Sequence, residues 1–156
     1  MSADLVEVND DVGTGKGLVA KTFIAAGSVI GDLVGEKLPQ ANMHSIHTQL
    51  HEHTEVSSLI KYTSHACVPN SAFQFETEPW KLVALKDISK GELITYDYET
   101  TEYISSDPFD CQCKTSGCRG QMKGFIYLDE SVKEKFITDG KVSPVIEALH
   151  KEEKQK

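Results

Sequence analysis

The sequence predicts a mainly β protein with a short helical tail at its C-terminus. In the first part of the chain, short runs of β-branched residues alternate with glycine-rich turns, a pattern typical of strands rather than helices. At 156 residues, the chain is long enough to form one domain with its own hydrophobic core. Its composition, 39% hydrophobic and 26% charged, is ordinary for a globular protein.

The expected strands follow one another closely along the chain. A glycine-rich turn at residues 13–17 separates the first two. From His44 to His53, apolar and polar residues alternate, which predicts one continuous strand. Residues 56–62 then predict a turn or a short helix leading to the next segment. In chain order, strands are expected at residues 5–8, 18–20, 29–34, 44–53, 73–76, 81–85 and 93–96.

Helical patterns are found only near the end of the chain, at residues 131–136 and 144–156. Ser143-Pro144 with Glu147 is a favourable helix start, because proline suits the first helical position. We expect the last residues, 151–156, to fray.

Four histidines, at positions 44, 47, 51 and 53, raise the question of a metal site. His47, His51 and His53 could share one strand face, but at strand rise they span roughly 20 Å, too far for one ion. A solvent-facing polar strand is therefore the preferred interpretation.

The four cysteines form a more specific pattern. Cys111, Cys113 and Cys118 follow a C-x-C-x4-C spacing, and Cys67 lies upstream in the segment that ends at Asn70. A structural zinc ion takes four nitrogen or sulfur ligands, so the cluster needs one more donor, and Cys67 is the remaining thiol. One structural zinc held by these four residues is the first interpretation. Two disulfides are the alternative, which a reducing compartment disfavours.

The net charge of −8 bears on possible partners. It argues against direct nucleic-acid binding, which depends on lysine and arginine neutralising phosphates. Acidic residues could instead attract a lysine-rich protein or peptide, although the charge could also serve only solubility. The chain contains no stretch of about 20 apolar residues and no signal-peptide pattern at its start, so we expect no membrane association and an intracellular, nuclear or cytoplasmic location.

Four sequence strings, in a fixed order over residues 12 to 120, resemble one known family. They are the glycine-rich segment 15–36, the segment His65-Ala66-Cys67-Val68-Pro69-Asn70, the segment Gly91-Glu92-Leu93-Ile94-Thr95-Tyr96-Asp97-Tyr98, and the cysteine cluster that ends in Arg119-Gly120. Together they look like the SET-domain protein lysine methyltransferases with a post-SET zinc motif. The resemblance implies a SET fold: small β-sheets around a knot-like junction where Tyr98 and His65 approach each other. It also implies a SET domain at 1–110, a post-SET zinc motif at 111–120 and a C-terminal extension at 121–156.

The resemblance further implies an activity: methyl transfer from S-adenosylmethionine to a lysine ε-amine of a histone-like or other basic peptide. Tyr98 matches the catalytic tyrosine, and Tyr96 matches the position that tunes the number of methyl groups added. Two residues apart on a strand, they would face the same way. The matching cofactor-binding positions are Lys16, Gly17, Leu18, Lys61, Tyr62, Ser64, His65 and Gln112.

Two departures from the family pattern favour an alternative. The family motif usually begins with asparagine where this chain has Ser64, and the interval from Glu36 to Ser64 is short for the segment that helps form the peptide groove. The alternative is a catalytically weakened or repurposed SET-fold protein that binds cofactor, a small molecule or a protein partner without methylating lysine.

Overall fold

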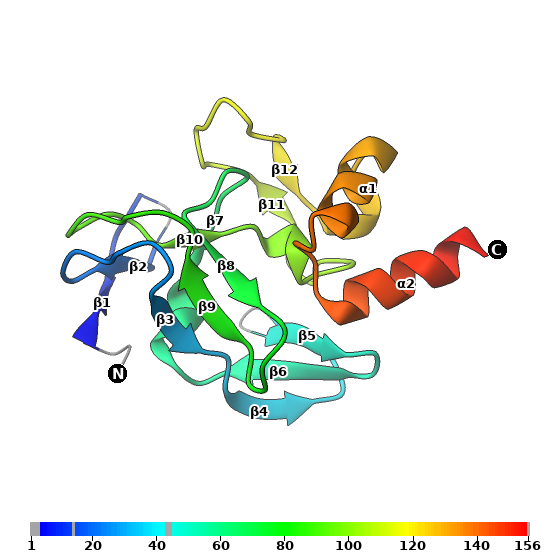
Figure 1. Cartoon of the computed structure of the whole chain (residues 1–156), viewed down its shortest axis with the longest axis horizontal. Coiled ribbons are helices and arrows are strands. Elements are labelled where there is room, and N and C mark those ends of the chain that lie inside the picture. Colours follow the sequence, from blue (N-terminus) through cyan, green and yellow to red (C-terminus); the bar gives the residue numbers. More distant parts are fainter. Residues whose placement is uncertain (1–3, 14, 43–44, 156) are drawn as a thin grey trace.

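The computed structural model describes residues 4–13, 15–42 and 45–155. It confirms a mainly β architecture, with two helices that lie together toward the C-terminal end of the chain (Figure 1). In the described residues, no helix has both the length and the apolar character needed to cross a membrane.

The strands form small sheets rather than one large one. β1 (Val6–Asn9) pairs with β2 (Gly17–Ala20), and β11 (Phe109–Asp110) pairs with β12 (Gln121–Met122), both antiparallel. One three-stranded sheet has the order β3-β9-β8, built from Val29–Asp32, Lys81–Ala84 and Ser71–Gln74. A second has the order β4-β6-β5, built from Gly35–Leu38, Glu52–Val56 and Ser45–Gln49.

The prediction of one continuous strand from His44 to His53 is wrong, because the described part of this segment forms a hairpin. β5 ends at Gln49, the chain turns at Leu50 and His51, and β6 returns antiparallel to β5. Leu50 is 51% exposed and lies in the turn, so the alternation does not mark one buried face. His51 is exposed as expected, whereas His47 and His53 are half-buried and stack with ring centroids 4.3 Å apart. His44 lies outside the described residues.

The main hydrophobic core lies between the small sheets. Fully buried side chains such as Leu18, Ile30 and Leu82 pack together from β2, β3 and β9. A second cluster, around Phe125, Val142 and Ile146, packs the C-terminal helices. Burial of such apolar side chains is the main favourable contribution to folding.

The C-terminal helices agree with their sequence signals. α1 spans Glu130–Thr138 and α2 spans Pro144–Lys154. The Ser143 hydroxyl accepts a hydrogen bond from Ile146 N at 3.2 Å, and Pro144 occupies the first turn. α2 lies beside the β5–β6 hairpin (Figure 1).

One short pairing, of only two residues on each strand, has the largest effect on the site. β7 (Ser64–His65) runs parallel to β10 (Thr95–Tyr96). β7 comes shortly after the 3-10 helix η2 (Leu59–Tyr62), and β10 comes shortly before the 3-10 helix η3 (Tyr98–Thr100). This contact places the two motif segments of the sequence side by side.

Candidate functional site

A cavity of about 800 Å³ lies next to the β7–β10 pair. Of the residues predicted to bind cofactor, those that line the cavity are Lys16, Lys61, Tyr62, Ser64, His65 and Gln112. Gly17 and Leu18 are not part of its wall, and the Leu18 side chain is fully buried in the core. A Cβ atom at position 17 would lie 2.6 Å from Val12 Cγ2, so close packing requires glycine there.

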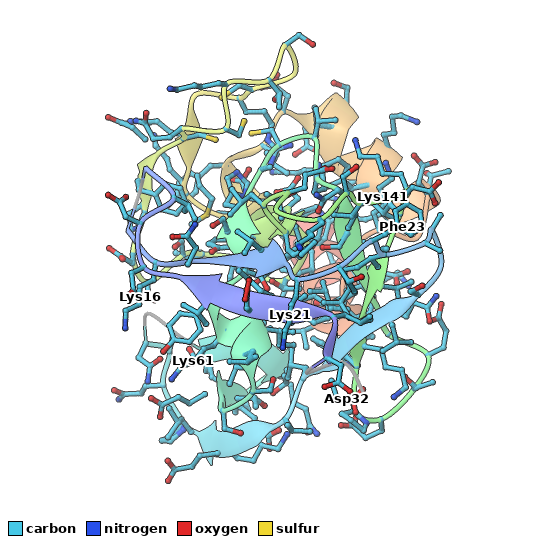
Figure 2. All side chains as sticks on the ribbon, turned by 90° about the vertical axis from the view of Figure 1, so that its left-hand side faces the viewer. Lys16, Lys21, Phe23, Asp32, Lys61 and Lys141 are labelled. Carbon is cyan, nitrogen blue, oxygen red and sulfur yellow. The ribbon has the colours of Figure 1, made fainter. Side chains whose placement is uncertain are left out.

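Two lysines and one aromatic ring form a group in this wall. The Nζ atoms of Lys16 and Lys61 lie 5.8 and 5.1 Å from the centroid of the Tyr62 ring. Both lysines lie at the same edge of the molecule (Figure 2). The glycine-rich turn supplies Lys16 and the helix η2 supplies Lys61 and Tyr62, so β2 and η2 must be held together for the group to form.

Tyr96 and Tyr98 line the same cavity, with ring centroids 4.9 Å apart. Tyr98 does not continue the strand but begins η3, and the two rings nevertheless come together. The Tyr98 hydroxyl donates to the carbonyl of Thr63 at 2.5 Å. Burial raises the pKa of Tyr98 to about 12 and raises the pKa of Tyr96 well above its usual value. Both phenols are therefore neutral at neutral pH, and the Tyr98 oxygen can still accept hydrogen bonds.

His65 joins Tyr98 to the cysteine cluster. Its Nδ1 accepts from Tyr98 N at 3.1 Å, and its Nε2 lies 3.6 Å from Cys67 Sγ. Burial, with a smaller effect from the Arg119 charge, lowers the pKa of His65 to about 4, so the ring is neutral. Because Nδ1 accepts, the proton lies on Nε2 and points to the sulfur.

The four cysteines come together as predicted. Their sulfur atoms all lie within 4.8 Å of one another, and none is bonded to another. The Sγ atoms of Cys67 and Cys111 are 3.8 Å apart. A tetrahedral zinc site with Zn–S bonds of about 2.3 Å has sulfur–sulfur distances of about 3.8 Å, so the arrangement fits that ion. Backbone N–H groups of Arg119 and Cys113 donate to the sulfurs of Cys67 and Cys111, as expected for ligands held in place by their surroundings.

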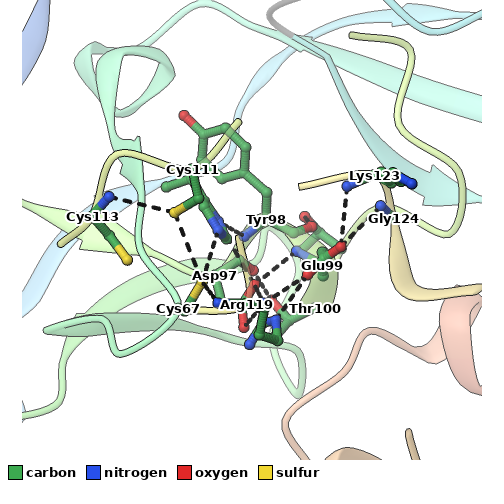
Figure 3. Close-up of polar contacts among 12 residues, drawn as sticks. Cys67, Asp97, Tyr98, Glu99, Thr100, Cys111, Cys113, Arg119, Lys123 and Gly124 are labelled. Carbon is green, nitrogen blue, oxygen red and sulfur yellow. Dashed lines mark hydrogen bonds and ion pairs between the residues drawn. The ribbon is translucent and has the colours of Figure 1, made fainter. Parts of the chain in front are cut away.

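Arg119 connects this cluster to the tyrosine segment (Figure 3). Its guanidinium donates to both carboxylate oxygens of Asp97, at 2.7 and 2.8 Å, and to Glu99 at 2.7 Å. The side chains of Asp97 and Glu99 are only 5% and 2% exposed. Burial raises the pKa of Asp97 to about 6 against the opposing effect of Arg119, so Asp97 is ionised at neutral pH. The carboxylates flank Tyr98, and Arg119 thereby holds the start of η3.

From the sequence, Glu99 and Glu102 are expected only as acidic residues that could attract a basic peptide, and Asp97 only as part of the tyrosine motif; none is assigned a place in the site. Asp97 and Glu99 flank the tyrosine motif, and a buried acid there could have been matched to Arg119, which directly follows the last cysteine. Glu102 gives no such signal, because it belongs to no motif. It nevertheless lines the cavity with the tyrosines.

The family model for the SET domain matches residues 15–99. The chain belongs to the SET-domain family. The matched residues include Cys67, Tyr96 and Tyr98 and end before Cys111.

Relatives of this SET-domain chain are methyltransferases. The methyltransferase flvH of Aspergillus flavus is 26% identical over 98 residues, which cover 63% of this chain and 55% of flvH. The H3 lysine-4 specific histone-lysine N-methyltransferase of Emericella nidulans is 31% identical over 127 residues, which cover 67% of this chain and 10% of that enzyme. The chain thus spans about half the length of flvH and a tenth of the histone enzyme.

A solved structure gives the same fold. The crystal structure of KRYPTONITE in complex with mCHG DNA and SAH superimposes with a TM-score of 0.64 at 20% identity, covering 74% of this chain and 28% of KRYPTONITE. A second KRYPTONITE structure, in complex with mCHH DNA, H3(1-15) peptide and SAH, gives a TM-score of 0.63 at 20% identity, covering 74% of this chain and 29% of that one.

The Arg119 ion pairs generate a stability prediction for this SET domain. Arg119→Ala leaves two buried carboxylates without their cation, which should lower the free energy of unfolding by about 3–5 kcal/mol. Lys151→Ala, which removes an exposed pair with Glu147, is the control and should change it by no more than about 0.5 kcal/mol. Urea denaturation of the three proteins measures both. An Arg119→Ala protein as stable as the parent would show that other groups neutralise Asp97 and Glu99.

Proposed function

We propose that this protein transfers a methyl group from S-adenosylmethionine to a lysine ε-amine of a basic protein or peptide. The observation that carries the proposal is the placement of the Tyr98 hydroxyl and the Tyr96 ring in one cavity with the residues matched to cofactor binding. Membership of a family whose curated relatives include histone-lysine methyltransferases supports it.

The cavity suits a cofactor of this kind. Its volume falls in the range of small-molecule sites. Tyr62 offers an aromatic surface, and Lys16 and Lys61 offer positive charge for a carboxylate. The KRYPTONITE structures contain SAH, which supports a related cofactor here. S-adenosylmethionine, when bound, supplies a methyl group on a positively charged sulfur. The residues proposed to hold it are those predicted cofactor residues that line the cavity: Lys16, Lys61, Tyr62, Ser64, His65 and Gln112. Gly17 and Leu18 lie outside the cavity wall, and a part for them in binding stays a prediction.

The tyrosines meet the needs of the acceptor amine. A lysine with its ordinary pKa of about 10.4 is protonated at neutral pH and has no lone pair for the methyl group. A buried site next to a positively charged sulfur favours the neutral amine. Tyr98 donates its own proton to Thr63, so its oxygen can accept an N–H of the amine and orient the nitrogen. Tyr96 packs beside it and limits the space for added methyl groups.

The proposed substrate is a lysine-containing basic peptide, histone-like or other. The H3(1-15) peptide in a KRYPTONITE structure and the net charge of −8 both support this class. The KRYPTONITE structures also contain DNA. That this chain makes no direct nucleic-acid contact stays a prediction, based on its acidity. We place the protein inside the cell, in the nucleus or cytoplasm, as its histone-methylating relatives suggest.

One structural zinc ion, held by Cys67, Cys111, Cys113 and Cys118, completes the proposal. We assign residues 1–110 to the SET domain, 111–120 to the post-SET motif and 121–156 to an extension. The extension is joined to the SET part, because Phe125 N donates to Glu102 O at 2.8 Å and Gly124 N donates to Glu99.

A second candidate function is that of a weakened or repurposed SET protein that binds a cofactor, small molecule or protein without methylating lysine. Ser64 favours it. This residue lines the cavity, and its backbone N–H donates to the carbonyl of Ile94, directly before β10. A serine reaches less far than the asparagine usual in the family, so a hydrogen bond to the cofactor could be missing.

Tyr98→Phe tests the proposed activity directly. Removing one polar group at the reacting centre should lower the rate of methyl transfer to an H3(1–15) peptide by about 100-fold or more. The loss of one hydrogen bond should change the free energy of unfolding by only about 1 kcal/mol. Tyr127→Phe, at a 60% exposed position outside the cavity, is the control and should have the activity of the parent. Full activity in Tyr98→Phe would contradict the role assigned to this hydroxyl.

Zinc removal should destabilise the C-terminal part of the molecule. We expect elemental analysis of reduced protein to give one zinc per chain, and Cys118→Ser to lose it together with a lower midpoint of thermal unfolding, because metal binding contributes folding free energy. Reduced protein that contains no zinc, or a mass that shows two disulfides, would exclude the site.

Ser64→Asn distinguishes the two candidate functions. In a weakened methyltransferase, the restored amide should tighten S-adenosylmethionine binding by roughly tenfold, equivalent to about 1.4 kcal/mol. In a repurposed site whose neighbours have adapted to serine, the larger side chain should be overpacked, and binding should stay the same or weaken. Calorimetric titration of parent and variant decides between them.

A further inference from the structure

Glu102 is a carboxylate in the cavity wall to which no role has yet been given. It follows η3, and its backbone N–H donates to Tyr98 O at 3.0 Å. This bond fixes the backbone of Glu102 next to Tyr98. Its side chain lines the same cavity as Tyr96 and Tyr98.

The carboxylate is only partly satisfied. Its Oε2 accepts from the backbone N–H of His47, on β5, at 3.0 Å. No lysine, arginine or histidine of the described residues forms an ion pair with it. Among the described residues, the fully buried side-chain atom that lacks a hydrogen-bond partner is Nδ1 of His53. The second oxygen of Glu102 is therefore not sealed inside the core. The second oxygen, Oε1, is therefore open and able to accept hydrogen bonds from a ligand.

The surroundings of Glu102 disfavour its negatively charged form when no cation is nearby. Burial raises the pKa of Glu102 to about 8, and the His47 N–H opposes this only in part. The titratable groups on the elements packed against it are the phenols of Tyr96 and Tyr98 and the imidazole of His47, whose Nε2 is bonded to Leu50 O. Asp107 and Asp110, and Lys16 and Lys61, line other parts of the cavity wall.

We propose that Glu102 is a substrate-recognition residue, whose carboxylate binds the ammonium form of the target amine as it enters the cavity. This assignment rests on the proposed transfer of a methyl group to an amine. An ammonium group brings three N–H donors and no acceptor. The open Glu102 oxygen and the Tyr98 oxygen can accept two of them, and the faces of Tyr96, Tyr98 and Phe109 suit the positive charge. Without a cation, the raised pKa keeps the Glu102 carboxyl group largely protonated at neutral pH, so a neutral or anionic substrate gains no charge pairing there.

Glu102→Gln is a sharp test because it removes the charge and keeps the shape. The amide oxygen of glutamine can still accept from His47 N, so the fold should persist. The probe is n-butylammonium, which reproduces the end of a lysine side chain, and 1-butanol is its uncharged counterpart. NMR titrations of the full zinc-loaded chain, with and without SAH, measure the affinity for each probe.

In the parent, we expect n-butylammonium to bind at least tenfold more tightly than 1-butanol. Glu102→Gln should lose that preference and keep the SAH affinity of the parent. Glu55→Gln, which removes an equal charge on β6 outside the cavity wall, is the matched control and should keep the preference. The parent's affinity for the cation should also rise between about pH 6 and about pH 9 as Glu102 ionises, while the probe stays protonated; Glu102→Gln should show no such rise.

The outcomes separate this inference from the proposed function. A parent without cation preference, or a Glu102→Gln protein that keeps it, would overturn the role of Glu102, and SAH binding would leave methyl transfer standing. If SAH does not bind but the cation preference depends on Glu102, the recognition site stands and the proposed methyl transfer is wrong.

Discussion

Ser64 and His65 pair in parallel with Thr95 and Tyr96, and every part of the site depends on this short contact. A two-residue parallel pair is weak by itself, so other groups must hold it. Asn70 does so from one side: its Oδ1 accepts from Thr95 N at 2.9 Å, and its Nδ2 donates to Leu93 O at 2.8 Å. His65 does so from the other side, through Tyr98 N. With the pair in place, the cysteine of one segment and the tyrosines of the other lie on either side of one imidazole.

Much of this arrangement could be predicted from the sequence, because each motif residue has a chemical partner that it needs. Four thiols make one zinc site, and that requirement alone brings Cys67 to the segment after residue 110. The hairpin of β5 and β6 shows where such reasoning fails. An alternation with a period of two can continue through a tight turn such as Leu50-His51, so the pattern does not distinguish one long strand from a hairpin; the antiparallel pairing of β5 with β6 does.

Glu102 and the acidic partners of Arg119 show a second limit. Their partners are far away in the sequence: Glu102 accepts from the backbone of His47, and Arg119, which follows the last cysteine, donates to Asp97 and Glu99. Every residue except proline carries a backbone N–H group, so no pattern of residue types could reveal the contact with His47. Acids that look solvated in the sequence are buried, as Asp97 and Glu99 are, or half-buried, as Glu102 is, and such carboxylates are candidates for a role in a site.

Arg119 belongs to both halves of the site at once. Its backbone N–H donates to Cys67 Sγ, and its guanidinium holds the two acids that flank Tyr98. Arg119 therefore helps to hold both the Cys67 sulfur and the segment that carries Tyr98. If zinc and S-adenosylmethionine bind as proposed, thermodynamic reciprocity requires that a cofactor which tightens zinc binding through Arg119 is itself bound more tightly, by the same factor, when zinc is present. With such a coupling, abundant cofactor would help the protein to retain its metal when zinc is scarce.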